Sequence, residues 1–389
     1  MTRLLFVDDE PHIVQALSRM MRKARDEFEV RTALSGPEAL DIMSKWPADV
    51  VVSDMRMPGM DGVQLLTRIA KDYPEAVRLI LSGHTDREVI MQSAIVAHQF
   101  LSKPCDAETL VNTLRRAKSV RELLNDKKIR DVVGRTTQLP CLSSTYADLM
   151  KVLGTEGTTV KEVAEVVSRD LVLTARVMQL VNSAFFGMPR SMDNVADAIS
   201  HLGIDVLRGL AAAVQAFDDF EDVVGQASLI NLFNHSLSVG SIAREIAIAE
   251  AMTVRDQEDA LLAGMLHDIG KLVLAQAYPA SQEAILSQDE EWWPPEKGEQ
   301  QAVGLSHAEV GAYLLGLWGF QNHIVEAVAF HDRPSACPIP IFSITTLLHV
   351  ANAIACHRLD QIDHDYLSGV GKNEALNRWV TLRGVRDAA

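Results

Sequence analysis

The sequence predicts a doubly wound α/β domain with a five-stranded parallel sheet, followed by an all-helical domain. Over residues 1–120, short runs of β-branched residues alternate with segments of helical periodicity, which is typical of a parallel sheet covered by helices. After residue 134, helical periodicity continues almost to the end of the chain. A chain of 389 residues is also too long to fold around one ordinary hydrophobic core, which favours two or three domains.

The five strands are expected where short apolar runs are bounded by polar or turn residues. Between them, apolar residues recur at helical spacing, as Ile13, Leu17 and Met20 do. The strand-forming runs are LLFV (4–7), VRTA (30–33), DVVVS (49–53), RLILS (78–82) and HQFL (98–101).

Polar residues stand at the carboxyl ends of these strands, where a parallel sheet places its ligand site. Asp8 and Asp9 follow the first strand, Asp54 follows the third, Ser82 closes the fourth and Lys103 lies just beyond the fifth. Three converging carboxylates repel one another unless a cation joins them, and hard oxygen ligands suit Mg²⁺. With a hydroxyl and a lysine nearby, such a site can hold a phosphoryl group on a carboxylate as an aspartyl phosphate.

The motifs VDDE, SDMRMPGMDG and FLSKP resemble those of the receiver domain of two-component response regulators, over residues 1–120. The resemblance implies a flavodoxin-like fold, phosphorylation by a cognate histidine kinase, and a cis peptide bond between Lys103 and Pro104. The implied roles are phosphoacceptor for Asp54, Mg²⁺ ligands for Asp8, Asp9 and Asp54, and switch residues for Ser82, Phe100 and Lys103.

Residues 106–133 are predicted to extend the last helix of the first domain as a linker helix. Its apolar residues recur at spacings of three and four, with charged residues between them. Two interpretations stay open: this face packs on its own sheet, or its far half pairs with a second protomer in a homodimer. The residues concerned are Leu110, Leu114, Ala117, Val120 and Leu124.

The second domain contains the motifs TTVKEVAEVVSRD, LVLTARVMQLVNSAFFG, AISHLG, NHSLSVGSIAREIA and HDIGKL. Thr159 and Glu162 are spaced as a helix capping box, and Asp170 is expected to begin the next helix. Together the motifs resemble the HDOD family, a relative of HD-GYP and other HD phosphohydrolases. The resemblance covers residues 134–335, with a helical tail at 336–389, and implies a regulatory output domain.

An adjacent His267 and Asp268 interrupt the apolar stretch LLAGMLHDIGKLVLA (261–275). An HD metal site needs a first His, the His-Asp doublet and a later Asp, because imidazoles bind a borderline metal and carboxylates balance its charge. His235 is the candidate for the first His. Asn352 stands where the later Asp is expected, which removes an anionic ligand and weakens metal retention and water activation.

His307 and His331 match the additional histidines of HD relatives with a larger metal cluster, and Lys271 matches a lysine that contacts the substrate phosphate. Asp332 replaces a second consecutive His, and Asn231 replaces a Glu. The HD-like residues are therefore a candidate site for a divalent transition metal, with no catalytic residue assigned. The nearby stretch 287–301 is expected to be a loop that serves as a lid or partner contact, or simply packs on the surface.

The formal net charge is −15, and almost all of it lies beyond residue 125. Phosphate neutralisation by cations dominates nucleic-acid binding, so this acidic second domain is not expected to bind nucleic acid. Residues 195–211 have a helix, Gly, helix rhythm, but Arg208 is the single cation of the second helix and Gly203 fits a helix C-cap. The absence of a long apolar run and an acidic start predict a cytoplasmic protein that does not enter a membrane.

These features predict a response regulator in which phosphorylation of Asp54 controls an HDOD module that acts through protein contacts. By analogy of fold, its downstream partner is a signalling protein such as a cyclic-di-GMP enzyme. Two alternatives remain: an active metal-dependent phosphohydrolase of a cyclic dinucleotide, or a module that senses a nucleotide without cleaving it. Because the HD-like site is incomplete, a non-enzymatic role is favoured.

Overall fold

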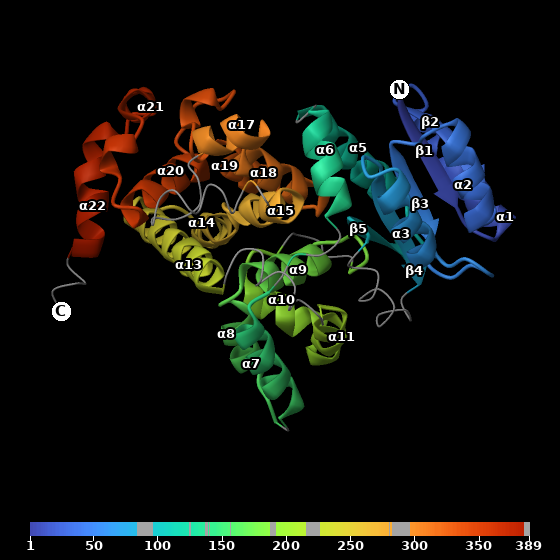
Figure 1. Ribbon diagram of the computed structural model, residues 1–389, viewed down its shortest axis with the longest axis horizontal. Helices are drawn as coiled ribbons and strands as arrows, with labels where there is room; N and C mark the ends of the chain where they lie inside the picture. Colours follow the sequence, from blue (N-terminus) through green and yellow to red (C-terminus); the bar gives the residue numbers. More distant parts are fainter. Residues whose placement is uncertain are drawn as a thin grey trace.

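The computed structural model describes residues 1–83, 96–123, 126–136, 139, 141–155, 157–186, 192–214, 226–279, 281 and 296–384. A five-stranded sheet with its helices forms the N-terminal end, and helices make up the remainder (Figure 1). The predicted fold class is confirmed.

The sheet is parallel and has the strand order β2-β1-β3-β4-β5, so β5 is an edge strand. All five predicted strands are present within two residues of their expected bounds. Proline in the first turn favours α1 and α2, and Asp61 with Gln64 forms a capping box on α3. The elements are β1 (Thr2–Val7), α1 (Pro11–Met20), β2 (Phe28–Ala33), α2 (Gly36–Lys45), β3 (Val50–Asp54), α3 (Gly62–Asp72), β4 (Val77–Gly83), β5 (Gln99–Lys103) and α5 (Ala107–Leu123).

The linker is two helices, so the prediction of one uninterrupted helix over 106–133 is wrong. Helix α5 ends at Leu123 and α6 spans Lys127–Arg135. Between them Asp126 has an extended backbone, and its side chain accepts a hydrogen bond from the Lys128 N–H. Asp126 is thus the N-cap residue of a separate helix.

The apolar face of α5 is buried within the chain itself. Leu110, Leu114 and Ala117 are fully buried, and Val120 lies against Gly316 of the second domain. This burial supports the interpretation in which the face packs on its own chain. Leu124 lies outside the described residues, and a homodimer stays a prediction.

The second domain is a helical bundle in which α7 to α11 form a lobe below α13 to α20 in the view of Figure 1. Its C-terminal part includes α20, which packs against α13 and α14, and α22, which packs against α13. The helices are α7 (Ser143–Gly154), α8 (Val160–Val167), α9 (Leu171–Val181), α10 (Val195–Leu202), α11 (Ile204–Val214), α13 (Gln226–Ala249), α14 (Val254–Leu266), α15 (Ile269–Ala277), α17 (Glu296–Val303), α18 (His307–Leu317), α19 (Asn322–Phe330), α20 (Ile344–Ala355), α21 (His364–Gly369) and α22 (Leu376–Gly384).

The predicted helix ends of the second domain are confirmed. Thr159 and Glu162 form a reciprocal capping box at α8, and Asp170 caps α9. Gly203 ends α10 with a φ of 84°, a left-handed conformation that glycine adopts without strain.

Replacement of Asp170 by Ala is expected to destabilise the second domain. The fully buried Asp170 carboxylate accepts hydrogen bonds from the N–H groups of Val172, Leu173 and Leu142, so it joins α9 to the start of α7. Loss of this buried cap should lower the free energy of unfolding by about 2–4 kcal/mol. Urea unfolding followed by circular dichroism measures the change. Exposed Asp148 is the matched control, because its replacement by Ala should cost less than about 0.5 kcal/mol.

The stretch Val254–Ala277 is long and apolar enough to cross a membrane by composition, but 78% of its most apolar window is buried. It forms α14 and α15, which lie inside the bundle and carry the His267–Asp268 doublet between them. Its apolar character is therefore explained by core packing.

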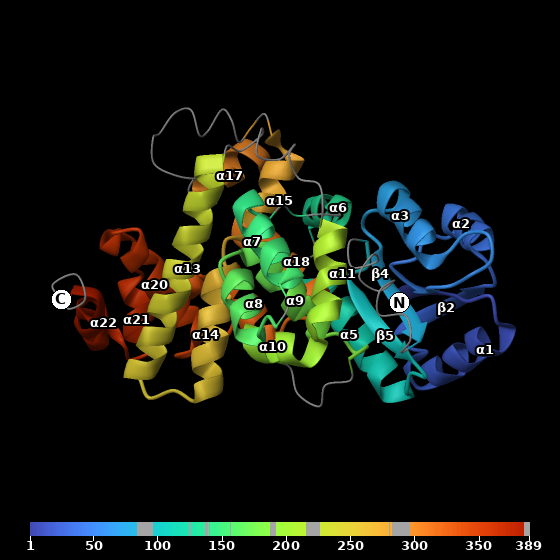
Figure 2. The same cartoon turned by 90° about the horizontal axis from the view of Figure 1, so that it is seen from below.

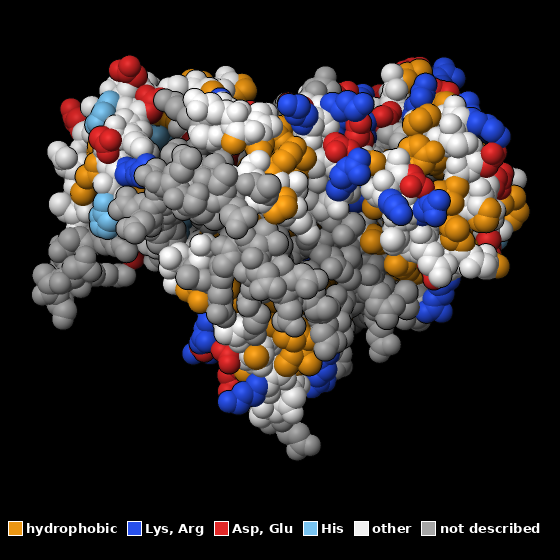
Figure 3. Space-filling view, in the orientation of Figure 1, with side chains coloured by type: hydrophobic (Ala, Val, Ile, Leu, Met, Phe, Trp, Pro, Cys, Tyr) orange, Lys and Arg blue, Asp and Glu red, His pale blue; other side chains and the backbone are white. Residues whose placement is uncertain are grey.

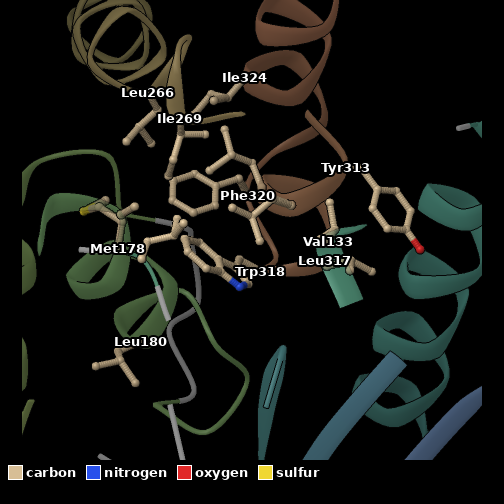
Figure 4. Close-up of a cluster of buried hydrophobic side chains, with 14 of the residues drawn as sticks. Val133, Met178, Leu180, Leu266, Ile269, Tyr313, Leu317, Trp318, Phe320 and Ile324 are labelled. Atoms are coloured by element: carbon tan, nitrogen blue, oxygen red, sulfur yellow. The ribbon is translucent and has the colours of Figure 1, made fainter. Parts of the chain in front are cut away.

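The two domains are joined by an extensive apolar contact. Helix α5 and strand β5 of the first domain lie beside the second domain, whereas α1 and α2 lie on the far side (Figure 2). Around α18, Leu317, Trp318 and Phe320 pack with Val133 of α6 in a buried cluster (Figure 4). In the same view, Tyr313 points from α18 toward the linker helices.

Polar contacts cover the open edge of β5. The Gln99 side-chain amide donates to the Leu317 carbonyl at 2.9 Å, and the Gln179 amide donates to the His98 carbonyl at 3.0 Å. The Phe185 N–H donates to the Phe100 carbonyl at 3.1 Å. An edge strand presents unpaired backbone groups, and here the second domain supplies partners for them.

Candidate functional sites

The first candidate site lies at the carboxyl ends of β1, β3 and β5. The Lys103 ammonium lies 2.7 Å from Asp8 Oδ2 and also pairs with Asp54 Oδ1. Asp54 is the last residue of β3, and its Oδ2 accepts the Arg56 N–H at 2.9 Å. Asp9 follows Asp8 directly and is only partly buried. The predicted convergence of carboxylates and lysine is therefore present.

Burial and charge oppose each other in this cluster. Burial raises the pKa of Asp54, although the Lys103 ammonium pulls it down. Burial alone would lower the pKa of Lys103, but its hydrogen bonds to Asp54 and Asp8 raise it. Lys103 therefore stays cationic and can stabilise added negative charge on the Asp54 carboxylate.

The predicted switch residues lie on the strands that continue from this cluster. Ser82 is buried in β4, one residue beyond Leu81, which pairs with Asp54 in the sheet. Phe100 in β5 is fully buried. The Lys103–Pro104 peptide bond is cis, as predicted.

The second candidate site, which we call the HD-like pocket, gathers residues from four segments of the bundle. His235 comes from α13, His267 and Asp268 from the α14–α15 junction, His307 from the start of α18, and His331 from the end of α19. Asp268 lies at the centre. Its Oδ2 is 3.4 Å from His267 Nε2 and 3.7 Å from His235 Nε2, and its Oδ1 is 3.2 Å from His307 Nε2.

The pocket is charged despite its burial. The Lys271 ammonium lies 2.7 Å from Asp268 Oδ2. Burial alone would raise the pKa of Asp268, but the surrounding His267, Lys271 and His307 hold it well below the ordinary value. Burial alone would lower the pKa of His307, but the Glu299 carboxylate raises it to about 9. Asp268 is thus an anion that several donors surround.

Sequence reasoning missed Glu299. Glu299 is buried and accepts hydrogen bonds from both the backbone N–H and Nδ1 of His307, each at 2.8 Å. It belongs to α17, inside the stretch that was expected to be a loop. Residues 287–295 of that stretch lie outside the described residues. No local signal marks Glu299, because its helix is short and its partner His307 lies beyond a turn.

The remaining predicted residues surround the pocket at different depths. Asn352 of α20 donates its side-chain amide to Asp332 Oδ1 at 3.4 Å. Cys356, one turn further on, lies 4.0 Å from His235 Nδ1. Asn231 is exposed on α13. His349 makes two hydrogen bonds away from the pocket, to the His331 carbonyl and from the Asp363 N–H.

Family comparisons agree with this division of the chain. A model of the HDOD domain matches residues 139–334, and a model of the response regulator receiver domain matches residues 4–115. The hydrogenase transcriptional regulatory protein HoxA of Cupriavidus necator is 35% identical over 136 residues, which are 34% of this chain and 28% of HoxA. An uncharacterized protein of Treponema pallidum is 25% identical over 216 residues, which are 54% of this chain and 41% of that protein.

Among solved structures, the MmoQ response regulator from Methylococcus capsulatus is similar with a TM-score of 0.48 and 23% identity, over 62% of this chain and 98% of that chain. A response regulator receiver domain protein from Clostridium thermocellum has a TM-score of 0.30 and 33% identity, over 32% of this chain and 99% of that one. The chain spans between about a quarter and two fifths of the length of the first curated relatives that it matches.

Proposed function

The chain belongs to the HDOD family and is a response regulator with a receiver domain and an HDOD output domain, and from this premise we propose that phosphorylation of Asp54 controls the HDOD domain through protein contacts. The observation that carries the proposal is the contact between β5 and the HDOD domain. The backbone carbonyl of Phe100, the proposed switch residue of β5, accepts a hydrogen bond from the Phe185 N–H. A phosphoryl-dependent movement of β5 would therefore act directly on the output domain.

Mg²⁺ is the cofactor proposed for the receiver site. Asp8 and Asp54 supply buried carboxylates, Asp9 supplies a third that is partly exposed, and Lys103 balances only one negative charge. This oxygen-rich donor set fits a hard divalent cation. When bound, Mg²⁺ would neutralise phosphoryl charge, and the Lys103 ammonium would pair with part of the remaining negative charge.

A kinase is the upstream partner that the receiver domain implies. The proposed downstream partner is a signalling protein, with a cyclic-di-GMP enzyme as the specific candidate, and the proposed location is the cytoplasm. Basic and acidic side chains are interspersed over the receiver domain on the face in Figure 3, a distribution that suits protein contacts better than a phosphate backbone. Homodimer formation on phosphorylation is a further part of the proposal.

Two measurements in cells separate this role from its alternatives. Cyclic-di-GMP levels should respond to expression of the wild-type chain and lose that response in Asp54→Asn. The response should persist in a variant with His267→Gln and Asp268→Asn, because the proposal assigns no hydrolysis to the HD-like pocket. A response that needs the pocket but not Asp54 would favour the phosphohydrolase.

The purified protein is expected to turn over cyclic-di-GMP negligibly, even with added Mn²⁺ or Fe²⁺. Asn352 stands where an HD metal site has a second aspartate, and an amide cannot replace that carboxylate in activating a water molecule. In addition, the Lys271 ammonium already pairs with Asp268. Chromatographic separation of the linear product measures the rate. Turnover at ordinary enzyme rates of about 1 s⁻¹ or more, lost in His267→Gln, would falsify the regulatory assignment of the pocket.

A further inference from the structure

The centre of the HD-like pocket is closed to solvent. His267 is fully buried, and Asp268 and His307 are 1% and 3% exposed. At the rim, the side chains of His235 and Lys271 keep some contact with solvent. A small molecule can therefore reach the centre only if an element that covers the pocket moves.

Helix α17 covers the His307 side of the pocket, but it is weakly anchored to the bundle. It lies at the periphery of the bundle in the view of Figure 2. Among its side chains from 298 to 303, that of Glu299 is buried, that of Val303 is half-buried, and those of 300–302 are exposed. Burial of an apolar face holds most helices in place, and α17 has little such burial.

One carboxylate holds α17 against the pocket. Glu299 Oε2 accepts hydrogen bonds from the backbone N–H and from Nδ1 of His307, each at 2.8 Å. Hydrogen bonds to an ionised carboxylate are roughly twice as strong as those between neutral groups. This contact can therefore keep a short helix in place without an apolar face.

The other oxygen of the same carboxylate opposes the closed position. Glu299 is 1% exposed, and its Oε1 has no hydrogen-bond partner among the residues that the structure describes. A buried charged oxygen without a partner is unfavourable, and water would hydrate it if α17 lifted. The closed position is therefore stabilised at Oε2 and opposed at Oε1, as expected for a contact that opens.

A flexible joint separates α17 from α18. Gly304 is exposed and has a φ of 71°, a left-handed conformation that glycine adopts without strain. Its N–H donates to the Gln300 carbonyl at 2.9 Å and ends α17. The Ser306 hydroxyl accepts the Ala308 N–H at 3.2 Å and begins α18. Because each helix has its own end, rotation at Gly304 can move α17 while α18 stays in place.

We propose that α17 is a lid on the HD-like pocket, which hinges at Gly304 and is held shut by the contact between Glu299 and His307. Opening of the lid transfers the Glu299 carboxylate into water and uncovers the pocket from the side of His307. The lid controls the entry of small molecules to the buried centre. This role does not depend on phosphorylation of Asp54.

Hydrogen exchange of the full-length wild-type chain, resolved to single amides, tests the lid without any substitution. The His307 N–H, which is bound to Glu299, should exchange at least about tenfold faster than that of Leu314 in the middle of α18. Its rate should not change in dilute urea, because the opening is local. The Ala308 N–H should stay protected, since its bond to Ser306 persists when only α17 moves.

Chemical modification measures access to the pocket. Diethylpyrocarbonate should modify His267 at least about tenfold faster in Glu299→Gln than in the wild type, because burial shields this histidine and Glu299 makes no listed bond to it. Exposed His364 provides the reference rate, and peptide mass spectrometry locates the modification. Gln300→Ala is the matched control, because this exposed neighbour lies on the same helix, and the His267 rate should stay within about threefold.

Two outcomes would overturn the lid. One is a His307 amide that exchanges together with those of Ala308 and Leu314, only when the whole domain unfolds. The other is His267 that stays unreactive in Glu299→Gln, although circular dichroism shows a folded protein and His364 reacts normally. If Glu299→Gln does not fold, the exchange of the wild-type chain decides the question.

Discussion

Asp54→Asn is expected to abolish phosphoryl uptake by the protein completely. In the wild-type chain, incubation with Mg²⁺ and a small phosphodonor should add one acid-labile phosphoryl group. Asp54 lies at the end of β3, and its carboxylate pairs with Lys103, which also pairs with Asp8. Asn keeps the shape of Asp but cannot attack phosphorus as a carboxylate does. Intact-protein mass spectrometry at neutral pH measures the uptake.

Asp41→Asn is the matched control, because Asp41 is an exposed carboxylate of the same domain that pairs with Lys45. Its uptake should equal that of the wild type. Asp8→Asn should slow uptake strongly without removing the acceptor, since Asp8 is a proposed Mg²⁺ ligand. Stoichiometric, acid-labile labelling of Asp54→Asn would show that the phosphoacceptor is another residue.

The parts of the fold that depend on local signals were predictable from the sequence. The β-branched runs gave each strand within two residues, and Thr159 with Glu162 marked the start of α8. The HD-like pocket was also predictable as a set, because His235, His267 and Asp268 match a spaced motif that the bundle does bring together.

The break in the linker is marked in the sequence by a helix-capping residue, which the prediction from apolar periodicity did not take into account. Spacings of three and four continue from Leu110 to Leu124, but the next apolar residue, Ile129, follows five positions later. Asp126, however, precedes Lys127 as a typical N-cap residue, and the structure uses it in that role. Apolar periodicity reports which face is buried, and a capping residue reports where a helix begins.

The contact between the domains could not be predicted, because its polar members carry no periodicity. Gln99, Gln179 and Arg176 are ordinary polar residues in the sequence, yet all three are buried or nearly so. Their partners are backbone carbonyls and the Trp318 ring, which lies 4.3 Å from the Arg176 guanidinium carbon. Pairs of this kind depend on tertiary structure alone. Glu299 escaped prediction for the same reason.

Helix α18 connects the receiver domain with the HD-like pocket. Its C-terminal residue Leu317 accepts the hydrogen bond from Gln99 of β5, and Gly316 lies against Val120 of α5. Its first residue, His307, lies in the pocket 3.2 Å from Asp268. A helix is stiff along its axis, so a displacement at one end is transmitted to the other. We therefore expect a displacement of β5 to reach the pocket through α18.

Beryllofluoride, a phosphoryl analogue, is expected to loosen the contact between β5 and the HDOD domain. An anion on Asp54 would draw Ser82 and Lys103 toward itself, and Ser82 pairs with Ser102 of β5 in the sheet. A shift of β5 would weaken the hydrogen bond from Gln99 to the Leu317 carbonyl and the one from the Phe185 N–H to the Phe100 carbonyl. A bias of a few kcal/mol is sufficient to change the population of the closed arrangement severalfold or more. Hydrogen exchange over 171–181 and 307–317 should accelerate, and Asp54→Asn should show no change.

Gly134→Ala should reproduce part of this loosening without any phosphoryl analogue. A methyl group at Gly134 of α6 would overlap the Pro74 carbonyl oxygen of the receiver domain, and neither backbone can withdraw easily. Gly154→Ala in α7 is the matched control, since a methyl group there meets nothing within 4 Å. If exchange and small-angle scattering of the wild type stay unchanged while beryllofluoride demonstrably occupies the receiver, the two domains respond independently and the contact mechanism is wrong. If exchange over 307–317 accelerates in the wild type but not in Asp54→Asn, the signal passes from the aspartate through β5 to α18.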